Sequence, residues 1–520
     1  MKHFLFLALL TGVFSSGLSA QNKGHLSGSL ESNSIYYVKD NKLDAGNSVN
    51  PDDHFGSNNY LKLDYTCGKF SAGIQLEGYL PALQGYDMGL YGTKDAFWGM
   101  KYVSWQDENF AFRVGDIFEQ FGSGIVFRSF EDRTLGINNS VEGIFGTYSY
   151  RNLITLKGLY GRPRLYSEYA DSWVRGADLS LSISDMTGWK NVFLNVEGSY
   201  MNRYEEVPEE MADVARPSVD MFSARANVDW NGFNASVEYV GKSDDVSPSL
   251  IGTTDKGHGL LAEMGYSYRN FSVLATYREL KYMNTKLSLI GDGVGNTLNY
   301  LPALTRQYTY MLANLNPYQS NGEGERGGQI DAYYSWRSKS DRSRYMNLHA
   351  NASLFYSDKD ITKKSRMLWR DINGDIEFQW NKQLKTTLLV SVQEWSPSHG
   401  LKDKTYASNI FVLDALYKFD RKKSIRAEVQ YLYSEDYEKD WVAGLVEFNL
   451  APSWSFSVSD MYNHGTSKVH YYSGSVSYTR KNTRLQLSYG RNRAGYVCSG
   501  GVCRYTPAYT GANLTLTTSF

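Results

Sequence analysis

Hydrophobic and polar residues alternate along most of this chain with a period of two. Between positions 512 and 520 the even residues are mostly apolar and the odd ones polar, and residues 233–239, 425–431 and 483–489 follow the same pattern. Such alternation is typical of a β-strand with one apolar face and one wet face. Because soluble β-sandwiches also produce it, the alternation alone does not decide the fold class.

The lengths of the connections between the strands decide it. We expect about 24 strands (22–26) of roughly 9 to 14 residues, long enough to cross a bilayer when tilted. Short turns are expected at 66–68, 151–152, 231–232, 269–270, 381–382, 420–421 and 481–482. Long loops alternate with them, near 39–57, 80–93, 118–139, 163–173, 203–218, 243–257, 282–327 and 493–508, although the loops near 435–438 and 464–466 are shorter. This alternation predicts an all-β, transmembrane, antiparallel up-and-down β-barrel of the bacterial outer membrane, with periplasmic turns and both termini in the periplasm.

The tryptophans fall at the ends of the predicted strands. Those beside short turns are Trp105, Trp189, Trp230, Trp336, Trp380 and Trp454, and those at the long-loop ends are Trp98, Trp173, Trp369, Trp395 and Trp441. Indole rings prefer the headgroup level of a membrane, whereas soluble β-proteins place tryptophan near strand middles. The positions therefore predict two aromatic girdles.

The N-terminus has the pattern of a secretory signal peptide. Lys2 and His3 precede an apolar run at residues 4–13, and the small residues before position 21 suit a cleavage site. We expect residues 1–20 to be a signal peptide and residues 21–520 to be a single outer-membrane barrel domain. An uncleaved anchor is the alternative. The nearly equal numbers of basic and acidic residues, 54 and 55, argue against a nucleic-acid partner.

The end of the chain adds a partner. The last strand is amphipathic and ends on Phe520. Such an ending resembles the signal that the barrel insertion machinery reads on most bacterial outer-membrane barrels. We therefore expect two partners for this surface, the insertion machinery and the outer-membrane lipid.

A barrel of this size encloses a wide lumen that must be a channel or be filled. Only residues 21–25 precede the first predicted strand, so we expect the filling to come from the loops. One candidate is 119–133, in which the expected constriction residues are Phe121, Phe127, Arg128, Phe130 and Arg133. In this interpretation Arg128 and Arg133 pair with carboxylates of the lumen wall. The other is 282–327, in which Pro302 would open a short helix with Leu304, Tyr308, Leu312 and Leu315 on one face. Caps packed on the outer rim are the alternative.

Further lumen residues follow from the strand faces. The charges expected to face the lumen are Arg278, Arg426, Glu428 and Arg484.

Cys498 and Cys503 flank two glycines that would allow the chain to turn and the two cysteines to form a disulfide. Two free thiols are the alternative, and Cys67 has no predicted partner.

Chemistry-bearing residues are few. His349, Asn351 and Ser353 lie on one face of a predicted strand, and we expect this face to point into the lumen. The same holds for Asp371, Asn373, Asp375 and Glu377 on another strand. A phospholipase site would need such groups at the lipid-facing rim, so lumen lining is the better interpretation. We expect no catalytic residues, no metal site and no cofactor.

Three stretches carry a family resemblance. They are DHFGSNNYLKLDY (53–65) running into 68–70, LPALQGY (80–86), and GDIF (115–118) leading into 128–133. They resemble a family of uncharacterised outer-membrane barrels of Bacteroidota-type bacteria, classed as a domain of unknown function, over the whole mature chain. The resemblance implies a barrel and its location, and no substrate or active residue.

Two functional hypotheses follow. The first is a non-energised, porin-like channel that admits a small polar solute through a lumen narrowed by loops. The second is an accessory outer-membrane barrel that binds protein partners at its loops, in secretion or assembly. An enzyme is not expected.

Overall fold

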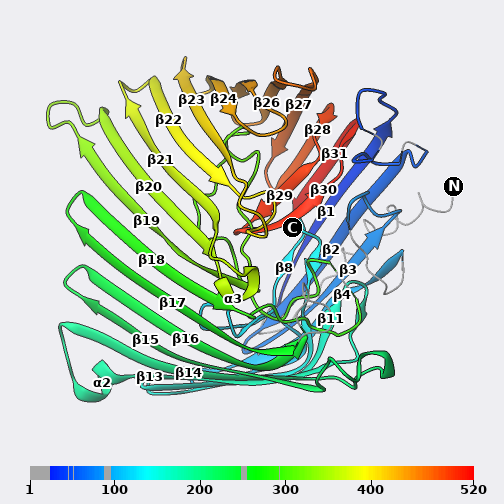
Figure 1. Ribbon diagram of the computed structural model, residues 1–520, viewed down its shortest axis with the longest axis vertical. Helices are drawn as coiled ribbons and strands as arrows, with labels where there is room; N and C mark the ends of the chain where they lie inside the picture. The colour runs from blue at the N-terminus through cyan, green and yellow to red at the C-terminus, as the bar shows by residue number, and fades with distance from the viewer. Residues whose placement is uncertain (1–23, 45, 51, 87–94, 247–253, 292) are drawn as a thin grey trace.

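The computed structural model describes residues 24–520, apart from residues 45, 51, 87–94, 247–253 and 292 (Figure 1). The predicted signal peptide, residues 1–20, lies outside the described residues. Parts of the predicted loops 80–93 and 243–257 also lie outside them.

The main sheet has 25 strands, and one of them, the two-residue strand β12, pairs with β11 beside the wall. The other 24 strands are antiparallel and form one closed barrel. The first twelve wall strands are β1 (His25–Val38), β2 (Phe55–Cys67), β3 (Phe70–Tyr79), β4 (Ala96–Gln106), β5 (Phe110–Ile117), β10 (Val141–Tyr150), β11 (Ile154–Leu165), β13 (Trp173–Ser182), β14 (Val192–Tyr204), β15 (Ser218–Trp230), β16 (Phe233–Val246) and β17 (Thr254–Tyr268). The other twelve are β18 (Phe271–Lys281), β19 (Gly324–Arg337), β20 (Tyr345–Ser357), β21 (Met367–Gln379), β22 (Leu384–Trp395), β23 (Tyr406–Lys418), β24 (Lys423–Ser434), β25 (Trp441–Leu450), β26 (Trp454–Asn463), β27 (His470–Arg480), β28 (Thr483–Asn492) and β31 (Tyr509–Ser519). The predicted fold class and strand number are confirmed.

The remaining elements are short. The two-residue strands are β6 (Gln120–Phe121), β7 (Phe127–Arg128), β8 (Glu131–Asp132), β9 (Ile137–Asn138) and β12 (Glu168–Tyr169), and β29 (Gly495–Ser499) pairs with β30 (Val502–Thr506). The helices are α2 (Ile183–Thr187), η1 (Glu209–Met211) and α3 (Lys359–Thr362). In the described part of the chain, no helix is long and apolar enough to cross a membrane.

The barrel closes where the last strand meets the first. β31 pairs with β1 in an antiparallel register that places Asn513 opposite Ile35. Gly28 and Phe520 exchange two backbone hydrogen bonds of 2.9 Å. His25 is paired with Thr66, beside the turn between β2 and β3. Both ends of the described chain therefore lie at the end of the barrel that carries the short turns, which we call the turn end; the other is the loop end.

The short turns follow from residues that tolerate a left-handed backbone. Arg151 and Asn152 have φ of 50° and 58°, and Asn231 and Gly232 have φ of 48° and 80°. Two consecutive positive φ values give the tight hairpin turn whose twist matches that of the strands. Local sequence thus fixes the strand register on both sides of each turn.

The two faces of the wall differ in chemistry. Outward side chains such as Ile372, Leu413 and Val458 are exposed and apolar. Their inward neighbours include Asp371 and Val412, which are buried against material inside the barrel. An exposed apolar outer face around a filled interior is the pattern of a barrel whose outside contacts lipid.

The predicted girdle at the loop end is only partly present. Trp98 and Trp173 are exposed, whereas Trp369 is 3% exposed and Trp441 is fully buried. Trp369 stacks on Tyr318 of the loop between β18 and β19, at a ring-centroid distance of 5.7 Å. The expectation that these two tryptophans face lipid is wrong, because loop residues fold inward and supply apolar partners there.

Candidate functional site

The interior of the barrel is crossed by three segments that enter from the loop end. They are residues 118–140, residues 282–323 and the β29–β30 hairpin, residues 495–506. Figure 1 shows the hairpin inside the ring of strands. We call the three segments together the plug. Both segments that the sequence predicts to fold inward therefore lie in the lumen, and the hairpin joins them.

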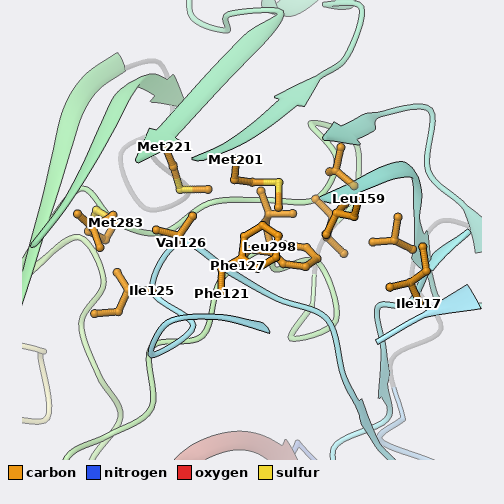
Figure 2. Packing of buried hydrophobic residues seen from close by; sticks show 14 of the residues in the cluster. Ile117, Phe121, Ile125, Val126, Phe127, Leu159, Met201, Met221, Met283 and Leu298 are labelled. Atoms are coloured by element: carbon orange, nitrogen blue, oxygen red, sulfur yellow. The ribbon is translucent and has the colours of Figure 1, made fainter. Parts of the chain in front are cut away.

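The first two segments of the plug share an apolar cluster with the barrel wall (Figure 2). Phe121 and Phe127 are fully buried in it, with ring centroids 5.5 Å apart. The wall contributes Met201, Met221, Val240 and Leu280, and residues 282–323 contribute Met283, Leu287 and Leu298. The backbone N–H of Arg128 donates to the carbonyl of Leu298 at 3.0 Å. The two segments thus pack as one unit.

The two predicted constriction arginines are held in different ways. Arg133 pairs with the Glu31 carboxylate of β1 at 2.8 Å, as a lumen-facing arginine was expected to do. The Arg128 guanidinium instead lies over the rings of half-buried Phe130 and of Tyr300, 4.5 Å and 3.8 Å from their centroids. Aromatic faces attract a cation and replace the carboxylate that the sequence suggests for Arg128.

The tip of the first segment docks on a buried ionic cluster of the wall. Arg225 of β15 lies within 3.6 Å of three carboxylates, those of Asp178, Glu197 and Glu238. The Ser123 backbone N–H donates to Glu238 at 3.0 Å. Gly122, at φ 55°, lies so close that an added Cβ would be 2.5 Å from Glu238 and 2.7 Å from Arg225. Only glycine fits this backbone and this gap.

A second ionic contact anchors residues 282–323 near the loop end of β18 and β19. Arg278 is buried, and one of its Nη atoms lies 2.6 Å from Glu325. Its other Nη donates to the carbonyl of Pro302 at 2.5 Å. Tyr318 donates to the second carboxylate oxygen of Glu325 at 2.5 Å. One predicted lumen charge thereby ties two parts of the same loop to the wall.

From residue 306 onward the same segment runs along β21 to β24 with alternate residues bonded to the wall. The contacts, in order, are Arg306–Asp375 at 2.5 Å, Tyr308–Asp371 at 2.7 Å, Tyr310–Asp414 at 3.4 Å and Leu312 N–Gln430 at 2.8 Å. A period of two along the segment means an extended backbone. The wall carboxylates are thus docking points for the plug.

The predicted helix after Pro302 is therefore wrong. Residues 301–316 carry no helix, and Tyr308 and Leu312 reach different strands of the wall. A helix would point every other polar side chain of this stretch away from its partner. Bonds to the wall outweigh the local periodicity.

The Tyr308 hydroxyl is the hydrogen-bond donor in its contact with Asp371. Burial, together with the negative charge of Asp371, raises the pKa of Tyr308 well above its ordinary value. The phenol therefore keeps its proton at neutral pH and donates to the carboxylate.

The hairpin closes over the other two segments. Cys498 and Cys503 form a disulfide across it. The backbone N–H of Ala303 donates to the carbonyl of Gly501 at 2.9 Å, and the Tyr300 hydroxyl donates to Gly500. Sequence reasoning missed this role, although two short alternating runs around a glycine pair were a signal of a hairpin.

The other predicted lumen charges are inward but outside the plug contacts. Arg426 pairs with Asp414 at 2.9 Å and with Glu428 at 2.7 Å. Arg484 is exposed near the turn end and donates to Gln486 at 2.9 Å. These residues line the wall rather than hold the plug.

His349 and Ser353 are engaged in separate contacts. His349 lies 2.9 Å from Asp331 and 3.2 Å from Asp375, which also binds the plug. The Ser353 hydroxyl accepts a hydrogen bond from the Trp369 indole N–H at 3.2 Å. In the described residues no group of His, Cys, Asp or Glu is arranged to hold a metal ion.

The plug leaves polar space beside it. A cavity of about 860 Å³ opens at the turn end below Arg306 and Gln307 and is also lined by Asp331 and His349. A second cavity, of about 480 Å³, has Lys62 and Arg113 of the wall and Arg128 of the plug in its lining. Because both cavities are lined by polar side chains, both can hold water.

Comparison with known proteins places the chain in a family. The model of a family of unknown function (DUF6029) matches residues 1–520. The chain belongs to this family. The resemblance seen in the sequence thus agrees with the family match. No curated protein matches the chain.

Solved structures with a similar fold are barrels of other families. An E. coli P pilus tip assembly intermediate, PapC-PapD-PapK-PapG, is similar at a TM-score of 0.50 and 10% identity, covering 98% of this DUF6029 chain and 62% of that chain. The P pilus usher PapC translocation pore gives 0.45 and 9%, covering 95% and 99%. Pseudomonas aeruginosa OccK3 gives 0.38 and 10%, covering 95% of each chain. At these identities the likeness is one of fold alone.

Proposed function

We propose that this DUF6029 protein is a non-energised outer-membrane channel for small polar solutes, narrowed by its own plug. In this proposal the turn end and both termini lie in the periplasm, and the loop end faces outward. The outer-membrane lipid surrounds the barrel, and the insertion machinery binds the final strand at Phe520.

The distribution of charge in the lumen supports the proposal. Wall strands β13 to β24 present paired charges such as Arg225–Asp178 and Arg426–Asp414 to the interior. Charges that are paired and hydrogen-bonded make the lumen polar enough to hold water, but they attract neither cations nor anions strongly. Such an interior suits the passage of a polar solute.

The observation that carries the proposal is the incomplete filling of the lumen. The 860 Å³ cavity at the turn end reaches up to Arg306 and Gln307 of the plug. A plug that served only to stabilise the barrel would be expected to pack without such polar space. A vestibule of this size is in the range of small-molecule sites.

The second candidate is an accessory barrel that binds protein partners at its loops. Leu401 and Tyr437, in two loops at the loop end, are 68% and 69% exposed. Exposed large apolar side chains of this kind favour a contact surface. A barrel that serves only this role would have no need to pass solutes.

Liposome swelling separates the two candidates. Purified protein is inserted into vesicles, which are then diluted into isotonic solutions of polar solutes of increasing size. We expect entry of small solutes and exclusion of large ones. Vesicles as tight as those without protein would overturn the channel proposal and favour the accessory barrel.

A further inference from the structure

One sector of the lumen wall differs from the rest in its chemistry. It consists of inward-facing residues of β26, β27, β28 and β31, and register places them side by side, with Ser457 opposite Ser475 and Ser488 opposite Asn513. We call it the hydroxyl sector: Ser455, Ser457, Ser459, Ser473, Ser475, Ser477, Thr479, Gln486, Ser488, Asn513, Thr515 and Thr517. Among the described inward positions of these four strands, the one charged side chain is Arg484, near the turn end.

The plug holds on to other parts of the wall. Its hydrogen bonds reach β1 at Glu31, β16 at Glu238, β21 at Asp375 and β24 at Gln430. Within the described residues, no hydrogen bond joins the plug to the hydroxyl sector. Apolar contact is confined to the loop end, where Met461 packs with the cluster around residues 312–315.

Apart from buried Ser477, the hydroxyl side chains of this sector are half-buried or exposed. Ser457 and Ser475 are half-buried and bond to each other, with their Oγ atoms 2.7 Å apart. Ser391 of β22, by contrast, is fully buried beneath Tyr308. The difference follows from the plug, which covers one side of the lumen and leaves the other to solvent.

Two charged pairs and one further carboxylate flank the sector. On the β1 side, Glu31 pairs with Arg133 of the plug at 2.8 Å. On the β24 side, Arg426 pairs with Asp414 at 2.9 Å. Between these flanks, Glu447 of β25 lies opposite Ser457, and its printed hydrogen bond is to the Asn449 amide at 2.6 Å. An anion that entered here would leave bulk water and be repelled by this carboxylate.

We propose that solutes pass along the hydroxyl sector, and that this path favours uncharged, polyhydroxylated molecules such as saccharides over anions of the same size. The inference rests on the proposed channel function. Serine, threonine and amide side chains both donate and accept hydrogen bonds, so they replace water around a hydroxyl-rich solute at little cost. An anionic solute loses part of its hydration on the same path and is in addition repelled by Glu447.

Thiol accessibility locates the path. In a Cys67→Ser background, Ser457→Cys and Ser475→Cys are each compared with Ser391→Cys, which lies beneath the plug. Single-channel currents are recorded while a small, uncharged methanethiosulfonate reagent is added. We expect the reagent to reduce conductance in both sector variants and to leave Ser391→Cys unchanged. Block of Ser391→Cys alone, or of none of the three in conducting channels, would overturn the inference while the channel function stands.

Solute selectivity tests the chemical class. Vesicles holding the parent protein are diluted into a neutral hexose or into the hexuronate of the same size. We expect hexuronate entry to be roughly tenfold slower, and Ser475→Lys to narrow that difference. Equal entry of both solutes would overturn the saccharide preference, whereas entry of neither would overturn the proposed channel itself.

Discussion

Arg306 of the plug and Asp375 of β21 approach to 2.5 Å between Nη2 and Oδ2, in the middle of the barrel wall. His349 holds the same carboxylate from the other side at 3.2 Å. The wall thus presents a carboxylate that is oriented before the plug reaches it. A contact to a charged group of this kind contributes about 1.5–3 kcal/mol, enough to keep an extended segment in place.

Removal of that contact should loosen the plug without unfolding the barrel. For Arg306→Ala we expect larger or noisier single-channel currents at unchanged heat-modifiability on a gel. The matched control is Lys385→Ala. Lys385 of β22 forms a 2.7 Å ion pair with Glu377, which lies on β21 like Asp375, and this pair includes no plug residue. Identical currents for both variants and the parent would show that Arg306 does not hold the plug.

The docking of the plug tip should depend on Gly122. An alanine there meets Glu238 and Arg225 at 2.5–2.7 Å, in addition to the cost of φ 55°. Overpacking of this kind costs about 1–3 kcal/mol, so Gly122→Ala should expose residues 118–133 to protease. Gly68→Ala is the control, because Gly68 has a similar φ of 59° and no neighbour within 4 Å. Equal protease sensitivity in the two variants would contradict this docking.

The face assignment of the last strand should appear in stability. Leu514 is exposed on the outer face, whereas Thr515 points inward, 3.4 Å from Asn33. Leu514→Arg should cost about 2–4 kcal/mol of unfolding free energy in lipid, and Thr515→Arg much less. Urea unfolding in vesicles measures both. A larger loss for Thr515→Arg would reverse the assignment.

Local signals in the sequence were enough to predict the barrel. Alternation of period two gives the strand faces, and pairs such as Asn231 and Gly232 determine where strands turn. The alternation recurs along the wall strands, so few errors accumulate. The loop at 282–323 was also expected to enter the lumen, because it is long and rich in apolar residues.

The internal structure of the plug was not predictable in the same way. Residues 306–309 lie outside any helix because their partners lie on the wall, and nothing in the local sequence encodes those partners. Trp369 faces inward because Tyr318 covers it from the loop. The position of the β29–β30 hairpin depends likewise on contacts with Tyr300 and Ala303. Tertiary partners overrode local periodicity at each of these positions.

The most direct test of the account is the conductance of the refolded protein in a planar bilayer, with and without residues 284–321. Deletion is feasible because the loop ends meet: the Tyr282 N–H donates to the carbonyl of Glu323 at 2.8 Å, and Met283 bonds to Gly322 at the same distance. A short Gly-Ser turn would therefore join them. We predict discrete current steps for the parent and larger steps for the shortened protein, with both folded. The absence of current steps from both proteins, or current steps of equal size, would contradict a channel narrowed by this plug.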